Sequence, residues 1–156
     1  MRKLIAILVI LISAGLHQVS FAQNNSIAGV SLDLTSSDFM EQIGAKAAEI
    51  ASSLKAKKCS VSVNEGLAKD IQKVCYVDIN LEYKGSEDVM PLAMLRSAFN
   101  AKYGVCWTGN ACTVMARTDA LFWKTPYGEI ALFEFAGKLC VRIFNYSGIT
   151  ESYTVF

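Results

Sequence analysis

The clearest periodic pattern in the chain lies between residues 35 and 58, where apolar residues recur every three or four positions. That spacing places them on one face of a helix. The apolar positions are Phe39, Ile43, Ala47, Ile50 and Leu54. Hydroxyl side chains before the pattern can cap a helix, and the lysines that end it suit the helix dipole. We therefore predict a single helix of about five turns.

Two segments further on alternate apolar and polar residues, which is typical of half-buried strands. They cover residues 59–63 and 75–83, and the residues Asn64-Glu65-Gly66 predict a turn after the first. A second helix is predicted between Pro91, which suits a first helical turn, and Gly104, which suits a helix end. Beyond it, turn-forming residues at 109–110, 118–119, 126–128 and 136–138 separate short apolar runs.

The last apolar run, from Tyr146 to Phe156, predicts a further strand. It could be an edge strand that a partner extends by backbone pairing, or the last strand of the core. The order of helix, two strands, helix and several strands favours the α+β class. We expect an antiparallel sheet covered on one face by two helices and braced by disulfides.

The first 22 residues have the pattern of a secretory signal peptide. Arg2 and Lys3 are followed by an uncharged apolar run from Leu4 to Leu16, and small side chains stand at Ser20 and Ala22. An uncleaved membrane anchor is the alternative, but the apolar run is shorter than a bilayer requires. We predict cleavage after residue 22, a single α+β domain over residues 23–156, and a periplasmic or secreted location without stable membrane insertion.

Five cysteines, all in the predicted exported part, indicate disulfide bonds in an oxidising compartment. Short spacing favours one pair between Cys59 and Cys75 and another between Cys106 and Cys112, although the sequence does not fix the connectivity. Cys140 then remains. It lies in an apolar strand pattern, so a buried thiol is expected there, with an intermolecular bridge or a reactive thiol as the alternatives.

Composition and residue types exclude several functions. The chain is 53% hydrophobic and 19% charged with a formal net charge of +1, which fits neither a disordered protein nor a nucleic-acid-binding one. Its one histidine, His17, lies in the predicted signal peptide. Without imidazole, Ser-His-Asp and Cys-His catalysis and the common zinc sites are disfavoured. No glycine-rich phosphate loop is present, and we expect no cofactor and no bound metal.

Aromatic residues near the predicted turns suggest a binding surface. The candidates are Trp107 and Asn110 in one loop, and Trp123 and Tyr127 beside the turn at Pro126. Amphipathic aromatic side chains on loops are common in protein interfaces. Each of these aromatic residues could instead belong to the core, and Trp123 shares a predicted strand face with Leu121.

Several scattered positions resemble a known family. They are Gly29, Leu32, Thr35, Phe39, Lys102-Tyr103-Gly104, Trp123, Gly128 and Ile130. In layout they are similar to the small lipoprotein subunit of the bacterial outer-membrane β-barrel assembly machinery and to related periplasmic domains. The resemblance implies an envelope adaptor that binds other proteins. The lipid-bearing cysteine of that family is missing here, so shared membrane attachment is not implied.

These patterns favour an exported, non-catalytic binding or adaptor module whose partner is a protein or a cell-envelope polymer. An inhibitor or immunity-type protein is one form of this hypothesis. The alternative is a small glycan hydrolase that uses two carboxylates. Glu129 and Glu134 are the nearest acidic pair, but an offset of five sends them to opposite faces of a strand.

Overall fold

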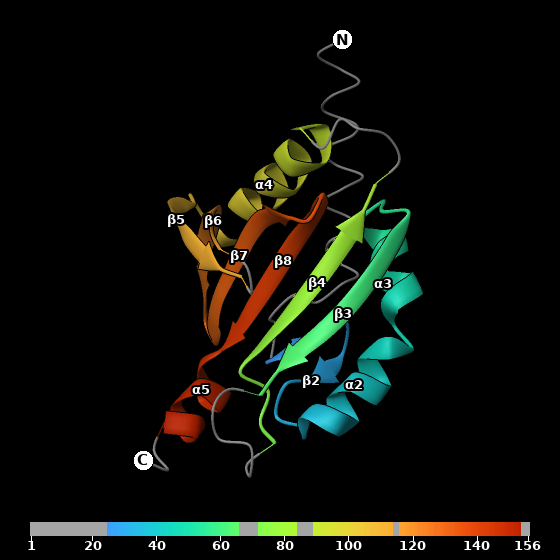
Figure 1. The fold of residues 1–156 in the computed structure, drawn as a ribbon, viewed down its shortest axis with the longest axis vertical. Coiled ribbons are helices and arrows are strands. Elements are labelled where there is room, and N and C mark those ends of the chain that lie inside the picture. Colours follow the sequence, from blue (N-terminus) through green and yellow to red (C-terminus); the bar gives the residue numbers. More distant parts are fainter. Residues whose placement is uncertain (1–24, 66–71, 84–88, 114–115, 154–156) are drawn as a thin grey trace.

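A six-stranded antiparallel sheet forms the centre of the computed structural model, which describes residues 25–65, 72–83, 89–113 and 116–153 (Figure 1). Across the sheet the order is β3 (Lys58–Asn64), β4 (Tyr76–Glu82), β8 (Lys138–Asn145), β7 (Gly128–Phe135), β6 (Arg117–Thr125) and β5 (Trp107–Cys112). The other elements are β1 (Ser26–Ile27), β2 (Val30–Ser31), α2 (Ser36–Gly44), α3 (Ala47–Ser53), α4 (Val89–Tyr103) and α5 (Tyr146–Tyr153). The predicted α+β class is confirmed. The predicted signal peptide lies outside the described residues.

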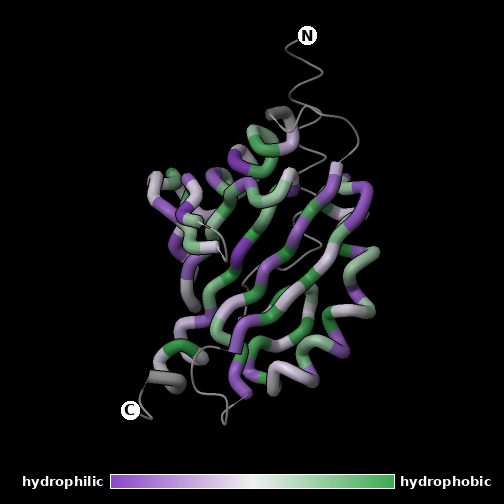
Figure 2. The backbone as a smooth tube through the Cα atoms, viewed as in Figure 1, coloured by the Kyte–Doolittle hydropathy of each residue, from purple (hydrophilic) through white to green (hydrophobic). Residues whose placement is uncertain are grey.

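Helices cover one face of the sheet. The core on that face joins apolar side chains of α2, α3 and α4 to the alternate strand residues that point toward them. From the helices come Phe39, Ile43, Ile50, Leu54, Leu95 and Phe99; from the strands come Val77, Ile79, Leu81, Trp123, Ile130, Leu132, Leu139, Val141 and Ile143. The alternation of hydropathy along β3 and β4 is visible in Figure 2. In the described part of the chain, no helix is both long and apolar enough to cross a membrane.

The single helix predicted after residue 35 is divided into α2 and α3. Thr35 caps α2, its Oγ1 accepting a hydrogen bond from the Asp38 N–H at 3.2 Å. The helix ends at Gly44, the residue of lowest helix propensity in the segment. The Lys46 N–H then bonds the Ile43 carbonyl at 2.9 Å, which closes the last turn of α2 before α3 begins.

Two of the predicted turns are present and two are not. Pro126 and Tyr127 connect β6 to β7, and β7 is joined to β8 by Ala136 and Gly137, whose φ angles of 51° and 72° suit a tight hairpin. The predicted breaks at 109–110 and 118–119 are wrong, because these residues pair with one another inside β5 and β6. Gly109 fits there because a Cβ would come within 2.8 Å of the Phe122 ring.

The predicted C-terminal strand is also wrong, because residues from Tyr146 to Tyr153 form α5. The last strand ends at Asn145, whose buried side-chain amide donates hydrogen bonds to the carbonyls of Val74 at 2.8 Å and Leu32 at 3.3 Å. Gly148 then lies against the Val74 carbonyl, where a side chain would collide. Strand addition at the C-terminal run is therefore excluded over the described residues.

None of the five cysteines is bonded to another, which corrects the predicted disulfide bracing. On β3, Cys59 pairs with Leu81, whereas Cys75 lies beyond the other end of β4, about 20 Å along the strands. In the second predicted pair, Cys106 immediately precedes β5 and Cys112 ends it, so extended backbone separates them by a similar distance. A disulfide needs Cα atoms closer than about 7 Å. As predicted, Cys140 is a buried thiol.

The far end of the sheet curls away from the helices. Arg142 on β8 donates a hydrogen bond from Nη1 to the carbonyl of Cys112 on β5 at 2.8 Å, although β7 and β6 lie between the two strands. In a flat sheet these strands would be about 14 Å apart. The curl therefore brings the end of β5 over the face of the sheet that faces the viewer in Figure 1.

Candidate functional site: a groove between α4 and the curled strands

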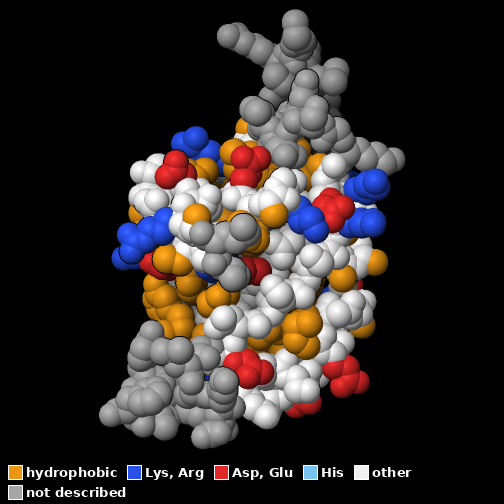
Figure 3. Space-filling view, in the orientation of Figure 1, with side chains coloured by type: hydrophobic (Ala, Val, Ile, Leu, Met, Phe, Trp, Pro, Cys, Tyr) orange, Lys and Arg blue, Asp and Glu red, His pale blue; other side chains and the backbone are white. Residues whose placement is uncertain are grey.

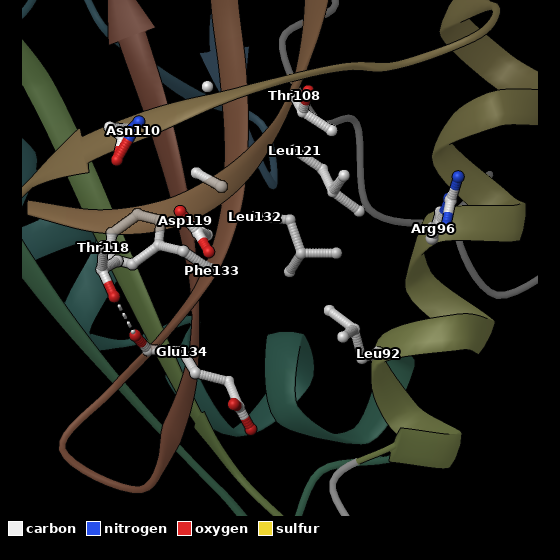
Figure 4. A pocket seen from close by; sticks show the side chains of 12 residues that line it. Leu92, Arg96, Thr108, Asn110, Thr118, Asp119, Leu121, Leu132, Phe133 and Glu134 are labelled. Carbon is white, nitrogen blue, oxygen red and sulfur yellow. Dashed lines mark hydrogen bonds between the residues drawn. The ribbon is translucent and has the colours of Figure 1, made fainter.

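An open groove separates α4 from β5, β6 and β7, with a volume of about 820 Å³ (Figure 4). It exists because β5, β6 and the end of β7 curl away from α4, whereas the rest of this face is covered by helices. The groove continues along α4 into a smaller cavity of about 330 Å³. Cavities of this size are typical of ligand and peptide sites.

The floor of the groove is apolar. Leu121 and Leu132 are paired in register on β6 and β7, and Leu92 faces them from the first turns of α4. Leu132 is 1% exposed, whereas Leu121 and Leu92 are only partly buried. The uncovered parts of these two side chains form the surface that an apolar group could contact.

The walls of the groove carry opposite charges. Arg96 projects from α4 on one side, and Asp119 and Glu134 stand on the strand side (Figure 4). The β6–β7 ladder ends at Ala120 and Phe133, and Asp119 and Glu134 are the residues immediately beyond that end on the two strands. All three charged side chains are exposed. Both acidic groups attract a cationic group that enters the groove from this side.

Polar groups of β5 complete the strand wall. Thr108 and Asn110 line the groove from this strand. Trp107 alternates with them and therefore faces the opposite side of the sheet. There its ring stacks on Phe122, with ring centroids 5.9 Å apart and planes at 16°.

The four residues predicted to bind a partner do not converge. Asn110 lines the groove, and Trp107, which is 40% exposed, lies on the other face. Tyr127, which is 41% exposed, stands at the β6–β7 turn. Trp123 is in the core at 1% exposure, and its Nε1 donates a hydrogen bond to Asn100 Oδ1 at 2.9 Å. A surface role for Trp123 is therefore excluded.

Sequence reasoning missed the residues that charge the groove. Arg96 is one of several polar residues on the exposed side of a helix, and nothing in its neighbours marks it. The residue pattern predicts a turn at Asp119, and its place on the same side of the groove as Glu134 depends on the strand register. The register itself could not be read from residue types, because Gly109 and Asn110 have strong turn preferences.

On the other face of the sheet, one buried ion pair holds four elements together. Arg142 binds both carboxylate oxygens of Asp78, at 2.7 and 2.9 Å, and lies between the rings of Tyr76 and Phe133, 4.3 and 5.2 Å from their centroids. Burial lowers the pKa of Arg142 and the hydrogen bonds that it donates to Asp78 raise it, with a net increase. With all its nitrogens near partners, Arg142 has a structural role.

Hydrophobic side chains are exposed on this second face (Figure 3), but most of them contact one another. Besides the Trp107–Phe122 stack, Tyr76 packs on Phe144 with centroids 5.9 Å apart. Burial raises the pKa of the Cys140 thiol beneath them, and Asp78 adds to the effect. Among the described residues, no group of three or more cysteine, histidine or acidic side chains could hold a metal ion.

Comparisons of the chain with protein-family models, with curated proteins and with solved structures gave no match.

Proposed function

We propose that this protein is an exported, non-catalytic binding module that holds a segment of a partner protein in the groove between α4 and strands β5 to β7. The observation that carries the proposal is the combination of an exposed apolar floor with walls of opposite charge. A peptide segment can offer an apolar side chain to the floor, a basic side chain to the acidic wall and an acidic side chain to the basic wall.

The orientation of the partner follows from the charges. A basic side chain would lie beside Asp119 and Glu134, and an acidic one beside Arg96, with an apolar residue over Leu121 between them. Backbone groups of the segment could bond the side chains of Thr108 and Asn110. The predicted signal peptide and the resemblance to envelope adaptors support a periplasmic or secreted setting, and an inhibitor or immunity-type protein is one form that such a module takes.

Site-specific photo-crosslinking tests the proposal. A benzophenone side chain at Asn110, in the groove, should capture a protein from the native compartment. The same group at Lys46, which immediately precedes α3 and lies outside the groove, is the matched control. Arg96→Glu should remove the cross-link at Asn110 while leaving the melting temperature within about 2 °C, because Arg96 is exposed. Equal capture at both positions, or capture that survives charge reversal, would contradict the proposed groove.

One observation keeps the glycan hydrolase as a second candidate, namely that two carboxylates, those of Asp119 and Glu134, line the strand side of one open groove. A glycosidase acid is held protonated by an apolar surrounding, whereas both of these groups are exposed. The binding function is therefore preferred. Turnover of a cell-wall glycan that is lost in both Asp119→Asn and Glu134→Gln, with the fold intact, would reverse this preference.

A further inference from the structure

The edge of the sheet opposite the groove is formed by β3, which pairs only with β4 among the described strands. This edge has seven residues, contains no proline and carries one charged side chain, that of Lys58. Natural edge strands are usually shorter, interrupted or more heavily charged, since unpaired backbone groups invite another strand.

The side chains of β3 that face the helices are incompletely covered. Cys59, Val61 and Val63 are only partly buried, whereas their neighbours on β4 are fully buried. They pack against the main core from its margin. A further strand beside β3 would cover the exposed parts of these three side chains.

Charges along this edge are separated by sign. Lys55, Lys57 and Lys58 lie at the start of β3, and all are exposed. Glu82, which is paired opposite Lys58, is an acidic residue at the same end and is bonded to Lys138 at 2.8 Å. Figure 3 shows basic side chains with acidic ones among them near this end, and acidic ones at the lower right, toward the other.

The acidic end is formed by α2 and the residue that follows β3. Asp38 and Glu41 are exposed on α2, and Glu65 lies beside them because its carboxylate accepts a hydrogen bond from the Ser36 hydroxyl. Lys73, which bridges to Thr35, is a basic residue at the same end. Among the described residues at this end, three acidic groups stand against one basic group.

We propose that β3 pairs antiparallel with β3 of a second copy of the chain, about a two-fold axis at Val61, to form a continuous sheet. Val61 is the middle residue of β3, so this register aligns the whole strand with its copy. Lys58 then faces Asn64 of the second copy, Ser60 faces Ser62, and Cys59 faces Val63. The basic end of each copy meets the acidic end of the other, as an isologous interface requires.

This interface is independent of the groove, which lies at the opposite edge of the sheet. Failure of one proposal therefore leaves the other unaffected. Sedimentation velocity of the protein purified with its native N-terminus measures the dimer directly. We expect a dimer at low salt that weakens as ionic strength rises, because the charged ends are exposed.

A charge exchange makes the test specific. Lys57→Glu with Lys58→Glu makes both ends of the edge acidic, and Asp38→Lys with Glu41→Lys makes both basic. Each double variant alone should dimerise at least about tenfold more weakly, and an equimolar mixture of the two should form a heterodimer with nearly the original affinity. Because the mixture recovers only if both variants are folded, misfolding cannot mimic this result.

A matched control is Lys124→Glu, which changes an exposed lysine on β6, far from β3. It should leave the dimer unchanged. A wild-type protein that stays monomeric at about 100 µM and low salt overturns the proposal, as does a mixture of the two double variants that fails to associate.

Discussion

Removing the carboxylate partner of Arg142 is the sharpest test of how the sheet is stabilised. In Asp78→Asn the guanidinium, whose side chain is 8% exposed, loses an ionic partner that binds two of its nitrogens at 2.7 and 2.9 Å. Its remaining partners are the Cys112 carbonyl and two aromatic rings. Breaking a buried pair from one side costs about 3 to 5 kcal/mol.

Because the Asp78 side chain is 17% exposed, the lower value of about 3 kcal/mol is expected for the loss in free energy of unfolding. For a domain of this size, that corresponds to a decrease in melting temperature of about 10 °C. Urea unfolding followed by circular dichroism gives the free energy, and a thermal scan gives the melting temperature. The loss of stability should lower the urea concentration at the midpoint of unfolding and leave the dependence of the free energy on urea concentration unchanged.

The exposed pair of Lys46 and Glu49 provides the control. Its atoms are 3.0 Å apart, but the side chains are 43% and 52% exposed, so Glu49→Gln should cost no more than about 0.5 kcal/mol. Replacing both buried partners, as in Asp78→Leu with Arg142→Met, should recover most of the stability. If Asp78→Asn costs as little as the control, Arg142 is effectively hydrated and the reasoning is wrong.

Four further outcomes are expected. In thiol labelling of the native protein, exposed Cys112 should react fastest. Burial raises the pKa of Cys59 to about 11, so its labelling rate should increase as the pH rises toward that value, because the thiolate is the reactive form. Equal labelling rates of Cys59 and Cys112 at pH 8 would contradict the described burial. Trp123→Phe should cost about 2 kcal/mol in urea unfolding through the lost hydrogen bond and volume, and no measurable change would place the ring outside the core. Trp107→Ala should cost about 1 kcal/mol or less and leave partner capture in the groove unchanged, because Trp107 lies on the opposite face of the sheet; a loss above about 3 kcal/mol would show that its stack is part of the core. Gly128→Ala should destabilise by about 2 kcal/mol or more, because its Cβ would meet a backbone carbonyl, and a neutral result would mean that β7 shifts freely.

Local patterns were sufficient for most of the elements. Alternation located β3 and β4, and helical spacing located α2, α3 and α4, since these signals depend only on which side of an element is buried. The errors lie where tertiary packing overrides a local preference. Gly109 and Asn110 favour a turn by themselves, but the Phe122 ring makes a glycine necessary within β5. Likewise, the contact of Gly148 with Val74 supports a helix where the residues Tyr146 to Phe156 suggest a strand.

The candidate site was less accessible to sequence reasoning than the fold. Its acidic wall depends on Asp119 and Glu134 lining the same side of the groove, which requires the register of β6 and β7. Its existence depends on the curl of the sheet, which is fixed by Arg142 reaching a strand three places away. Residue spacing carries no sign of the strand register or of a hydrogen bond between residues 30 positions apart. It does indicate the burial of Trp123, because Trp123 and Leu121 alternate on one face of a strand.

The hydrogen bond from Arg142 to Cys112 also bears on how the molecule opens. Without it, β5 would be joined to the rest of the sheet only through its ladder with β6, and such a peripheral strand can exchange its amides by opening alone. By fastening the end of β5 to β8 and, through Asp78, to β4, the guanidinium joins this strand to the most protected strands. The strand β5 and the central sheet should therefore form one cooperative unit, opening together rather than in sequence.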